Sequence, residues 1–201
     1  MKNKKIILIL ILFILYFIFY SFSYSYSVST DLEENLFRLH ILANSDSTED
    51  QELKLYVRNK VIEYLHQYNF SNKSELISFL KSNQTTLQQI IDNAIQEKGY
   101  TYTSSFEIEN SFYPQKQYEN ITLPAGNYDG LKIKIGKAEG KNWWCVLFPP
   151  MCLINNSTCT LPEESEIILD NSLTQESSSV ITSSNPNYKF KFKIIEFINN
   201  L

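Results

Sequence analysis

Residues 36–68 constrain the fold most strongly, because they encode a strand, a polar turn and a long helix in direct succession. The first eight residues, LFRLHILA, are bulky and mostly apolar, which is typical of a short strand. Ser47 then offers an N-cap for the helix, and Asp50 stands three residues further on, where a capping box usually has Glu. Acidic residues crowd the first helical turns, where the helix dipole favours negative charge. The pattern predicts a folding unit and not an active site.

The predicted helix carries apolar residues on two faces. One stripe, at steps of three and four, is expected to pack on the core and consists of Leu53, Val57, Val61, Tyr64, Leu65 and Tyr68. Leu55 and Ile62 fall on the opposite side, and Arg58 and His66 flank them. Single exposed apolar residues are common, so the exposure of Leu55 and Ile62 needs no functional explanation. The alternative is a docking surface in which two apolar anchors beside a cation bind a partner protein.

The chain changes from helical to strand periodicity near residue 100. Patterns and turn residues predict helices at 73–81 and 85–98, and strands at 100–109, 128–135, 143–148 and 188–194. Three segments are expected to connect these elements: a polar linker at 30–35, a hairpin loop at 136–142 and a flexible polar insertion at 155–187. The insertion is expected to contain a helical turn near residues 162–169. The order predicts an α+β fold in one domain, with three helices on one face of a mixed or antiparallel sheet of about five strands.

The N-terminus has the pattern of a targeting segment. Three lysines among the first five residues precede an unbroken apolar run that begins at Ile6 and ends at Tyr20. Serines then alternate with aromatic residues and valine over residues 21–29, which creates small-x-small cleavage motifs. Residues 1–29 are interpreted either as a cleaved signal peptide or as a retained membrane anchor. In both cases residues 30–201 are expected to form an exported domain.

Charge and motifs exclude several classes of function. Without the three N-terminal lysines, 15 basic residues face 22 acidic ones, a net charge of −7, so no nucleic-acid partner is expected. The two histidines, His40 and His66, lack a metal-ligand spacing, and no phosphate-binding loop or nucleophile elbow occurs. The sequence therefore predicts no metal, no cofactor and no catalytic set.

The cysteines leave two alternatives open. Cys145 and Cys152 flank two prolines that reverse the chain, so they are expected to form a disulfide or to stay as two buried thiols. Cys145 is also the one candidate nucleophile, although an apolar strand would raise the pKa of its thiol. A secreted cysteine-dependent hydrolase therefore remains an alternative function.

Trp143 and Trp144 are adjacent in a predicted strand with two apolar faces. Aromatic residues dominate protein cores, so packing is the simpler interpretation. Tryptophan is also enriched in interface hot spots, which makes both residues candidates for partner binding.

Two blocks of the sequence resemble the stage II sporulation protein R family. The first comprises RLHILANSDS at 38–47, EDQELKL at 49–55 and VR at 57–58. The second runs from LPAGNY at 123–128 to NWWCVLFPPMC at 142–152. Two long blocks in this order are far more specific than a short motif.

The resemblance, which covers roughly residues 36–152, implies a function that the residues alone do not. Members of this family are made in the forespore and exported by the export machinery toward the space between the forespore and mother-cell membranes. There they activate a membrane-embedded aspartic protease that processes pro-sigma-E. By this resemblance the protein is expected to be a non-enzymatic activating ligand of endospore formation, secreted or membrane-anchored. A structural protein of the cell envelope is the other alternative.

Overall fold

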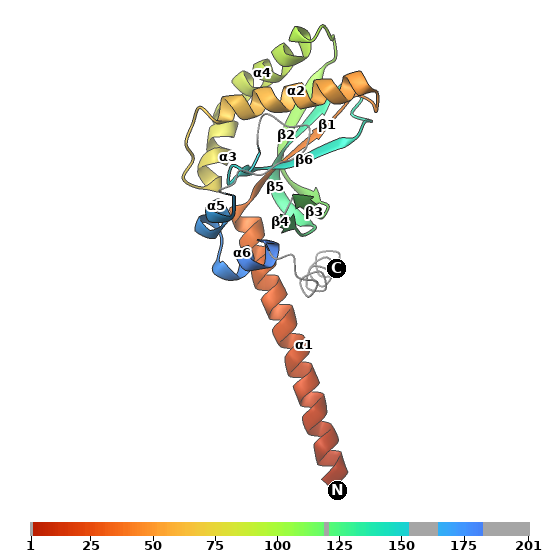
Figure 1. Ribbon diagram of the computed structural model, residues 1–201, viewed down its shortest axis with the longest axis vertical. Helices are drawn as coiled ribbons and strands as arrows, with labels where there is room; N and C mark the ends of the chain where they lie inside the picture. Colours follow the sequence, from red (N-terminus) through yellow and green to blue (C-terminus); the bar gives the residue numbers. More distant parts are fainter. Residues whose placement is uncertain (1, 119–120, 153–164, 183–201) are drawn as a thin grey trace.

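The computed structural model describes residues 2–118, 121–152 and 165–182. Along the chain the elements are α1 (Lys2–Asn35), β1 (Phe37–Leu42), α2 (Thr48–Leu65), α3 (Lys73–Ser82), α4 (Gln84–Glu97), β2 (Ser104–Tyr113), β3 (Lys116–Tyr118), β4 (Ile121–Leu123), β5 (Gly126–Ile135), β6 (Asn142–Phe148), α5 (Ser165–Ser172) and α6 (Gln175–Thr182). Figure 1 shows an α+β body from which the N-terminal part of α1 projects as a long isolated helix. The predicted fold class is confirmed.

Four strands form a mixed sheet in the order β2-β5-β1-β6. β1 runs parallel to β5 and antiparallel to β6, and β2 runs antiparallel to β5. The predicted hairpin between β5 and β6 is therefore wrong, because β1 lies between them. The residues of β1 are buried almost throughout, and such a strand takes the centre of a sheet with a neighbour on each edge. The predicted strand at 188–194 lies outside the described residues.

The first core lies between the sheet and helices α2, α3 and α4. Alternate residues of the central strands point into it: Phe37, Leu39, Ile41, Leu131, Ile133 and Ile135. The predicted stripe of α2 is buried from Leu53 to Leu65, whereas Tyr68 is 42% exposed because α2 ends at Leu65. The prediction of three helices on one face of the sheet is confirmed.

A second core forms on the opposite face of the sheet. Tyr113, Tyr128 and Val146 meet the small β3–β4 sheet there, together with α5, α6 and the last turns of α1. The predicted linker at 30–35 is wrong, since α1 continues unbroken to Asn35. Apolar residues on this side recur every four positions at the end of α1 and directly after it, which gives a helix a buried stripe even in a polar context: Val28, Leu32 and Leu36.

The predicted flexible insertion at 155–187 is wrong over residues 165–182, which form α5 and α6. Of the expected helical turn, residues 165–169 do lie in α5. The stretch is mostly polar, but a few apolar residues at helical spacing are at most 8% exposed: Leu169, Leu173, Val180 and Ile181. These residues anchor both helices in the second core, and burial of a side chain of this size stabilises by about 1.5–3 kcal/mol. The rest of the predicted insertion lies outside the described residues.

The turn between β1 and α2 is held by side chains. Ser47 is the N-cap of α2, as predicted, and accepts a hydrogen bond of 3.2 Å from the backbone N–H of Asp50. The Asp50 carboxylate completes no capping box; it accepts bonds of 2.8 Å from Asn44 Nδ2 and 2.6 Å from Ser45 Oγ. Burial raises the pKa of Asp50, but these bonds more than offset burial, and the pKa is lowered.

The loop between β5 and β6 closes over the same turn. Asn44 Oδ1 accepts a hydrogen bond of 2.9 Å from the Lys137 N–H, and Asp46 Oδ1 accepts one of 2.6 Å from the Lys141 N–H. Gly140 approaches so closely that a Cβ there would collide with the backbone of the turn. The first of the two family-like sequence blocks is thus held by hydrogen bonds to the loop before β6, which lies inside the second block.

Replacement of Asp50 by alanine is expected to lower the free energy of unfolding by about 3 kcal/mol. The change removes a buried carboxylate and leaves the donors of Asn44 and Ser45 without their acceptor. Urea unfolding of the full chain in detergent micelles measures the loss. Glu52→Ala is the matched control, because Glu52 is exposed on the same helix and its removal is expected to change stability by less than about 0.5 kcal/mol. Equal unfolding midpoints for the two variants would contradict this role of the turn.

Lys54 gives the protein a pH-dependent stability. It is 3% exposed, and its Nζ donates a hydrogen bond of 2.9 Å to the Lys141 carbonyl. Burial lowers the pKa of Lys54 from 10.5 to about 8. Between these values the unfolded chain binds more protons than the folded one, so the free energy of unfolding rises with pH. From pH 8 to pH 10 we expect wild type to gain on the order of 2 kcal/mol relative to Lys54→Met; parallel pH profiles of the two proteins in urea would contradict the assignment.

Candidate partner-binding surface

The six predicted partner-binding residues do not form one surface. Leu55 is half-buried and lines a hollow beside α2. Ile62 and Arg58 are only 1% and 2% exposed, so the prediction that Leu55 and Ile62 form an exposed apolar pair beside the Arg58 cation is wrong. The helix is covered on a second side, where Ile62 packs into the first core and Trp143 of β6 covers Arg58.

Trp143 and Trp144 face opposite sides of the sheet. Trp143 packs against the first core, and the guanidinium carbon of Arg58 lies 4.4 Å from the centroid of its ring. Trp144 stacks on His40 with 3.7 Å between ring centroids and meets the Tyr113 ring edge-on at 5.2 Å. Contacts of this kind hold aromatic side chains in place. Packing thus accounts for both tryptophans, and their binding of a partner remains a prediction.

His66 lies at the C-terminal end of α2, on a separate groove of about 430 Å³. Apolar side chains such as Phe70 and Leu147 form much of the wall, and Cys152 also lines it. Cys152 is joined to Cys145 by a disulfide, with 6.1 Å between the two Cα atoms. Of the two alternatives, a disulfide or two buried thiols, the structure has the disulfide. Cys145 therefore has no free thiol of the kind that a cysteine-dependent hydrolase would need.

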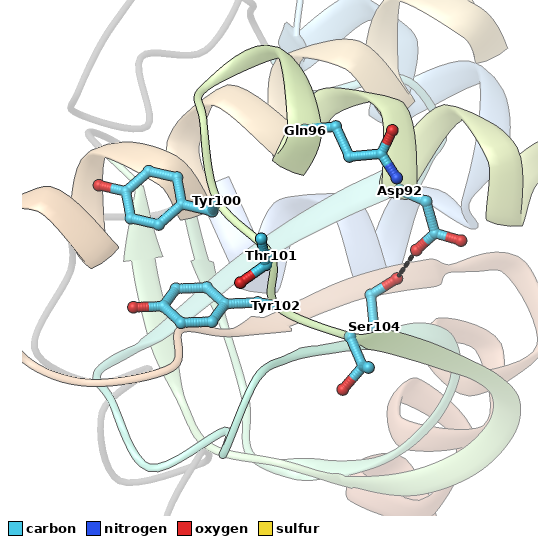
Figure 2. Close-up of a pocket in the computed structure, with 7 residues that line it drawn as sticks. Asp92, Gln96, Tyr100, Thr101, Tyr102 and Ser104 are labelled. Atoms are coloured by element: carbon cyan, nitrogen blue, oxygen red, sulfur yellow. Dashed lines mark hydrogen bonds between the residues drawn. The ribbon is translucent and has the colours of Figure 1, made fainter.

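Leu55 belongs to a different surface, which we call the Tyr100 surface; its members are Leu55, Tyr56, Tyr100, Tyr102, Glu49 and Glu52. It contains two hollows that share Tyr100, one of about 480 Å³ beside α4 and one of about 320 Å³ beside the first turns of α2. Figure 2 shows the Tyr100 and Tyr102 rings projecting to the same side, with 5.2 Å between their centroids. Asp92 accepts a hydrogen bond of 2.6 Å from Ser104 Oγ and closes the other side of the larger hollow.

The Tyr100 surface combines aromatic side chains with negative charge. Tyr56 donates a hydrogen bond of 2.7 Å to Glu97, which raises the pKa of Tyr56, and Lys98 Nζ lies 4.3 Å from the centroid of its ring. Glu49 and Glu52 are exposed, and neither forms an ion pair with any residue that the structure describes. A partner segment with an apolar side chain and a Lys or Arg is complementary to this arrangement.

The Tyr100 surface lies at one pole of the molecule. Figure 1 shows the end of α4 and the start of β2 at the top, whereas the N-terminal half of α1 extends from the bottom. The surface therefore points away from the helix that is apolar enough to enter a membrane.

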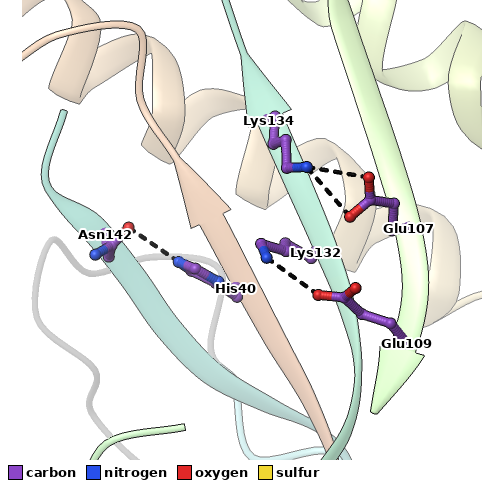
Figure 3. A network of polar contacts seen from close by, with 6 residues as sticks. All are labelled: His40, Glu107, Glu109, Lys132, Lys134 and Asn142. Atoms are coloured by element: carbon purple, nitrogen blue, oxygen red, sulfur yellow. Dashed lines mark hydrogen bonds and ion pairs between the residues drawn. The ribbon is translucent and has the colours of Figure 1, made fainter. Parts of the chain in front are cut away.

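The open part of the second sheet face carries a polar network (Figure 3). Lys132 and Lys134 form ion pairs of 3.1 and 3.0 Å with Glu109 and Glu107 on the neighbouring strand. His40 is 8% exposed, and its Nε2 lies 2.9 Å from an oxygen of Asn142. Burial lowers the pKa of His40, so the ring is neutral near pH 7. Partly exposed ion pairs of this kind contribute up to about 1 kcal/mol to stability. Among the described contacts of His40, no carboxylate orients the ring as a general base.

The fold and these surfaces can now be compared with known proteins. Residues 33–158 match the family model described as Stage II sporulation protein R. The chain belongs to this family. It is also 32% identical over 137 residues to Stage II sporulation protein R of Bacillus subtilis (strain 168). That alignment covers 67% of the chain and 61% of the relative, so the match spans less than two thirds of the relative's length. No solved structure matches significantly.

Membership in the stage II sporulation protein R family supports a role in spore formation. The matched residues begin near the end of α1 and include the whole four-stranded sheet with α2, α3 and α4. The Tyr100 surface lies inside this part of the chain. No group of three or more potential metal ligands occurs within residues 2–118, 121–152 and 165–182.

Arg38, in the first block of the family, is a residue whose role the sequence did not reveal. It is fully buried, with its guanidinium carbon 4.9 and 5.1 Å from the ring centroids of Tyr113 and Tyr128. Its Nη2 donates a hydrogen bond of 3.1 Å to the hydroxyl of Tyr118. A lone cation inside an apolar strand was the available signal, but its aromatic partners come from β2, β3 and β5, and only the packing of the two sheets brings them together.

Proposed function

We propose that the protein is an exported sporulation signal that activates a membrane-embedded aspartic protease on the mother-cell side. The protease then processes pro-sigma-E. Membership in the stage II sporulation protein R family is the observation that carries this proposal. The apolar helix α1, preceded by lysines, supports export from the forespore into the space between the two membranes.

The protein acts in this proposal as a binding ligand and not as an enzyme. The described part of the chain favours that role, because its one candidate nucleophile, Cys145, is 2% exposed and bonded to Cys152. The His40 ring is buried and stacks on Trp144, and its Nε2 is hydrogen-bonded to the side-chain amide of Asn142. Neither arrangement pairs a nucleophile with a base.

The Tyr100 surface is the proposed contact with the protease. Tyrosine and a neighbouring apolar residue are frequent anchors of interfaces, and Leu55 lies beside Tyr56 and Tyr100 in one hollow. Glu49 and Glu52 add negative charge that would speed the approach of a basic segment. The occupant is therefore an extracytoplasmic segment of the protease that carries an apolar side chain and a Lys or Arg.

The proposal is tested in a sporulating bacterium whose own family gene is deleted. The full chain, expressed in the forespore, is expected to restore conversion of pro-sigma-E to its shorter form, followed by immunoblot. A protease-deficient strain is the control and is expected to show no conversion. If the chain is exported and stable but pro-sigma-E stays intact, the proposed signalling function is wrong.

A further inference from the structure

The four-stranded sheet has an open edge at β2. The strand order is β2-β5-β1-β6, so within the described residues β2 has a neighbouring strand of this sheet on one side only. β2 is ten residues long and pairs with β5 from Ser104 to Tyr113. A long edge of this kind presents backbone N–H and C=O groups with which another extended segment can pair. The edge can therefore take a fifth strand.

The two faces of β2 differ in their chemistry. On the face toward the first core, Phe106 and Ile108 are only partly buried, and Phe112, at the same alternation, is 48% exposed. On the other face, Glu107 and Glu109 pair with the lysines of β5, yet their side chains stay 48% and 33% exposed (Figure 3). A strand that matches this edge alternates apolar residues with Lys or Arg.

The chain itself contains a segment with this alternation. Residues 188–194, which lie outside the described residues, have the sequence YKFKFKI. Beside β2, the lysines of this segment would extend the row of opposite charges that the lysines of β5 and the glutamates of β2 begin. The other strands match it less well. β6, at the opposite edge, has the sequence NWWCVLF without an acidic residue, and β3 and β4 have three residues each.

The position of α6 lets the segment reach this edge. Val180 and Ile181, near the end of α6, belong to the same second core as Tyr113, the last residue of β2. Residues 183–187 connect α6 to the segment, and a connection of this length spans up to about 20 Å. The segment would therefore enter at the Tyr113 end of β2 and run antiparallel to it.

We propose that residues 188–194 pair with the outer edge of β2 as a fifth strand of the sheet. In the antiparallel register that places Lys191 opposite Glu109, Lys193 lies opposite Glu107. The apolar residues of the segment then lie on the face of β2 toward the first core. The paired segment closes the edge to extended segments of other chains, a second copy of this protein included. The inference goes beyond the proposed function and assigns the segment no part in activating the protease.

A pair of introduced cysteines tests the pairing in the full chain in detergent micelles, with Cys159 replaced by serine. In the proposed register Ser111 lies opposite Lys189, at a Cα separation of about 5 Å that a disulfide can bridge. Ser111→Cys with Lys189→Cys is expected to give the intramolecular disulfide in most molecules on mild oxidation, detected by mass spectrometry of the linked peptides. Ser105→Cys with Lys189→Cys is the matched control. Ser105 lies on the same face of β2 but about 20 Å further along, so its yield is expected to be at least about tenfold lower.

Charge reversal tests what aligns the segment. Lys191→Glu with Lys193→Glu is expected to slow cross-linking of the Ser111 and Lys189 positions about tenfold, because the new carboxylates would meet those of β2. Lys191→Arg with Lys193→Arg keeps the positive charge and is expected to leave the rate of cross-linking unchanged.

Three results would overturn the inference: equal yields for the Ser111 and Ser105 pairs, covalent dimers in place of the intramolecular product, or a rate that charge reversal leaves unchanged. Dimers would mean that the segment pairs with a second copy. Circular dichroism checks the fold of each variant, and if the Ser111 variant does not fold, Asn110→Cys with Phe190→Cys tests the next opposed pair with the same outcomes. These measurements use purified protein, so a failure of pro-sigma-E processing in cells would leave them unaffected.

Discussion

Leu10→Arg combined with Leu12→Arg is expected to keep the protein in the cytoplasm and to abolish pro-sigma-E processing. Both leucines lie in the exposed apolar half of α1. Each arginine costs roughly 2.5–3.5 kcal/mol at the centre of a membrane-inserting helix, so the pair costs about 6 kcal/mol. The domain itself is expected to fold, because neither residue touches its two cores.

Fractionation of cells and accessibility to added protease measure the export of this variant. Leu10→Val with Leu12→Val is the matched control, since it changes the same positions and keeps them apolar. Normal export of the arginine variant would contradict the assignment of α1 as the targeting segment. Normal pro-sigma-E processing without export would contradict signalling from outside the forespore.

Leu55→Asp combined with Tyr100→Asp is expected to reduce activation of the protease by about a thousandfold. The two side chains meet in the smaller hollow of the Tyr100 surface. Loss of a hot-spot residue typically costs at least about 2 kcal/mol of binding, and each 1.4 kcal/mol is a factor of ten. The added carboxylates are not expected to repel the cation of the partner, so the predicted loss comes from the missing apolar anchors.

The fold of this variant is expected to survive, because both residues are half-buried and a typical substitution destabilises by about 1 kcal/mol. Circular dichroism and thermal unfolding check that expectation. Phe112→Asp is the matched control: Phe112 is 48% exposed on β2, outside the Tyr100 surface, and its change is expected to leave activation intact. A folded double variant with full activity would place the docking site elsewhere, and the groove beside His66 would then be the next candidate.

Much of the fold follows from local patterns. The strand, turn and helix of residues 36–68 were predictable because the N-cap at Ser47 and the apolar stripe of α2 are local signals. The position of β1 between β5 and β6 was not, because strand order depends on contacts between distant segments. The helix α6 and the second half of α5 were missed because their few buried apolar residues stand among many serines and acidic residues.

The candidate site was less predictable than the fold. Leu55 was found because it breaks the polar face of a helix, but periodicity alone also placed Ile62 and Arg58 at the surface. Trp143 covers that side of α2, and nothing local in the sequence of α2 signals it. The sequence predicts a strand from residue 100, whereas β2 begins only at Ser104 and leaves Tyr100 half-buried in the preceding loop.

We propose that this protein activates the protease directly, through contact of the Tyr100 surface with the protease. The most direct measurement is the rate of pro-sigma-E cleavage in vesicles that contain the purified protease, with and without the full chain in the same bilayer. We expect cleavage to accelerate when wild type is present and to stay at the basal rate with Leu55→Asp/Tyr100→Asp, while Phe112→Asp behaves as wild type. A cleavage rate that is independent of the protein, or full acceleration by the folded double variant, would contradict the claim.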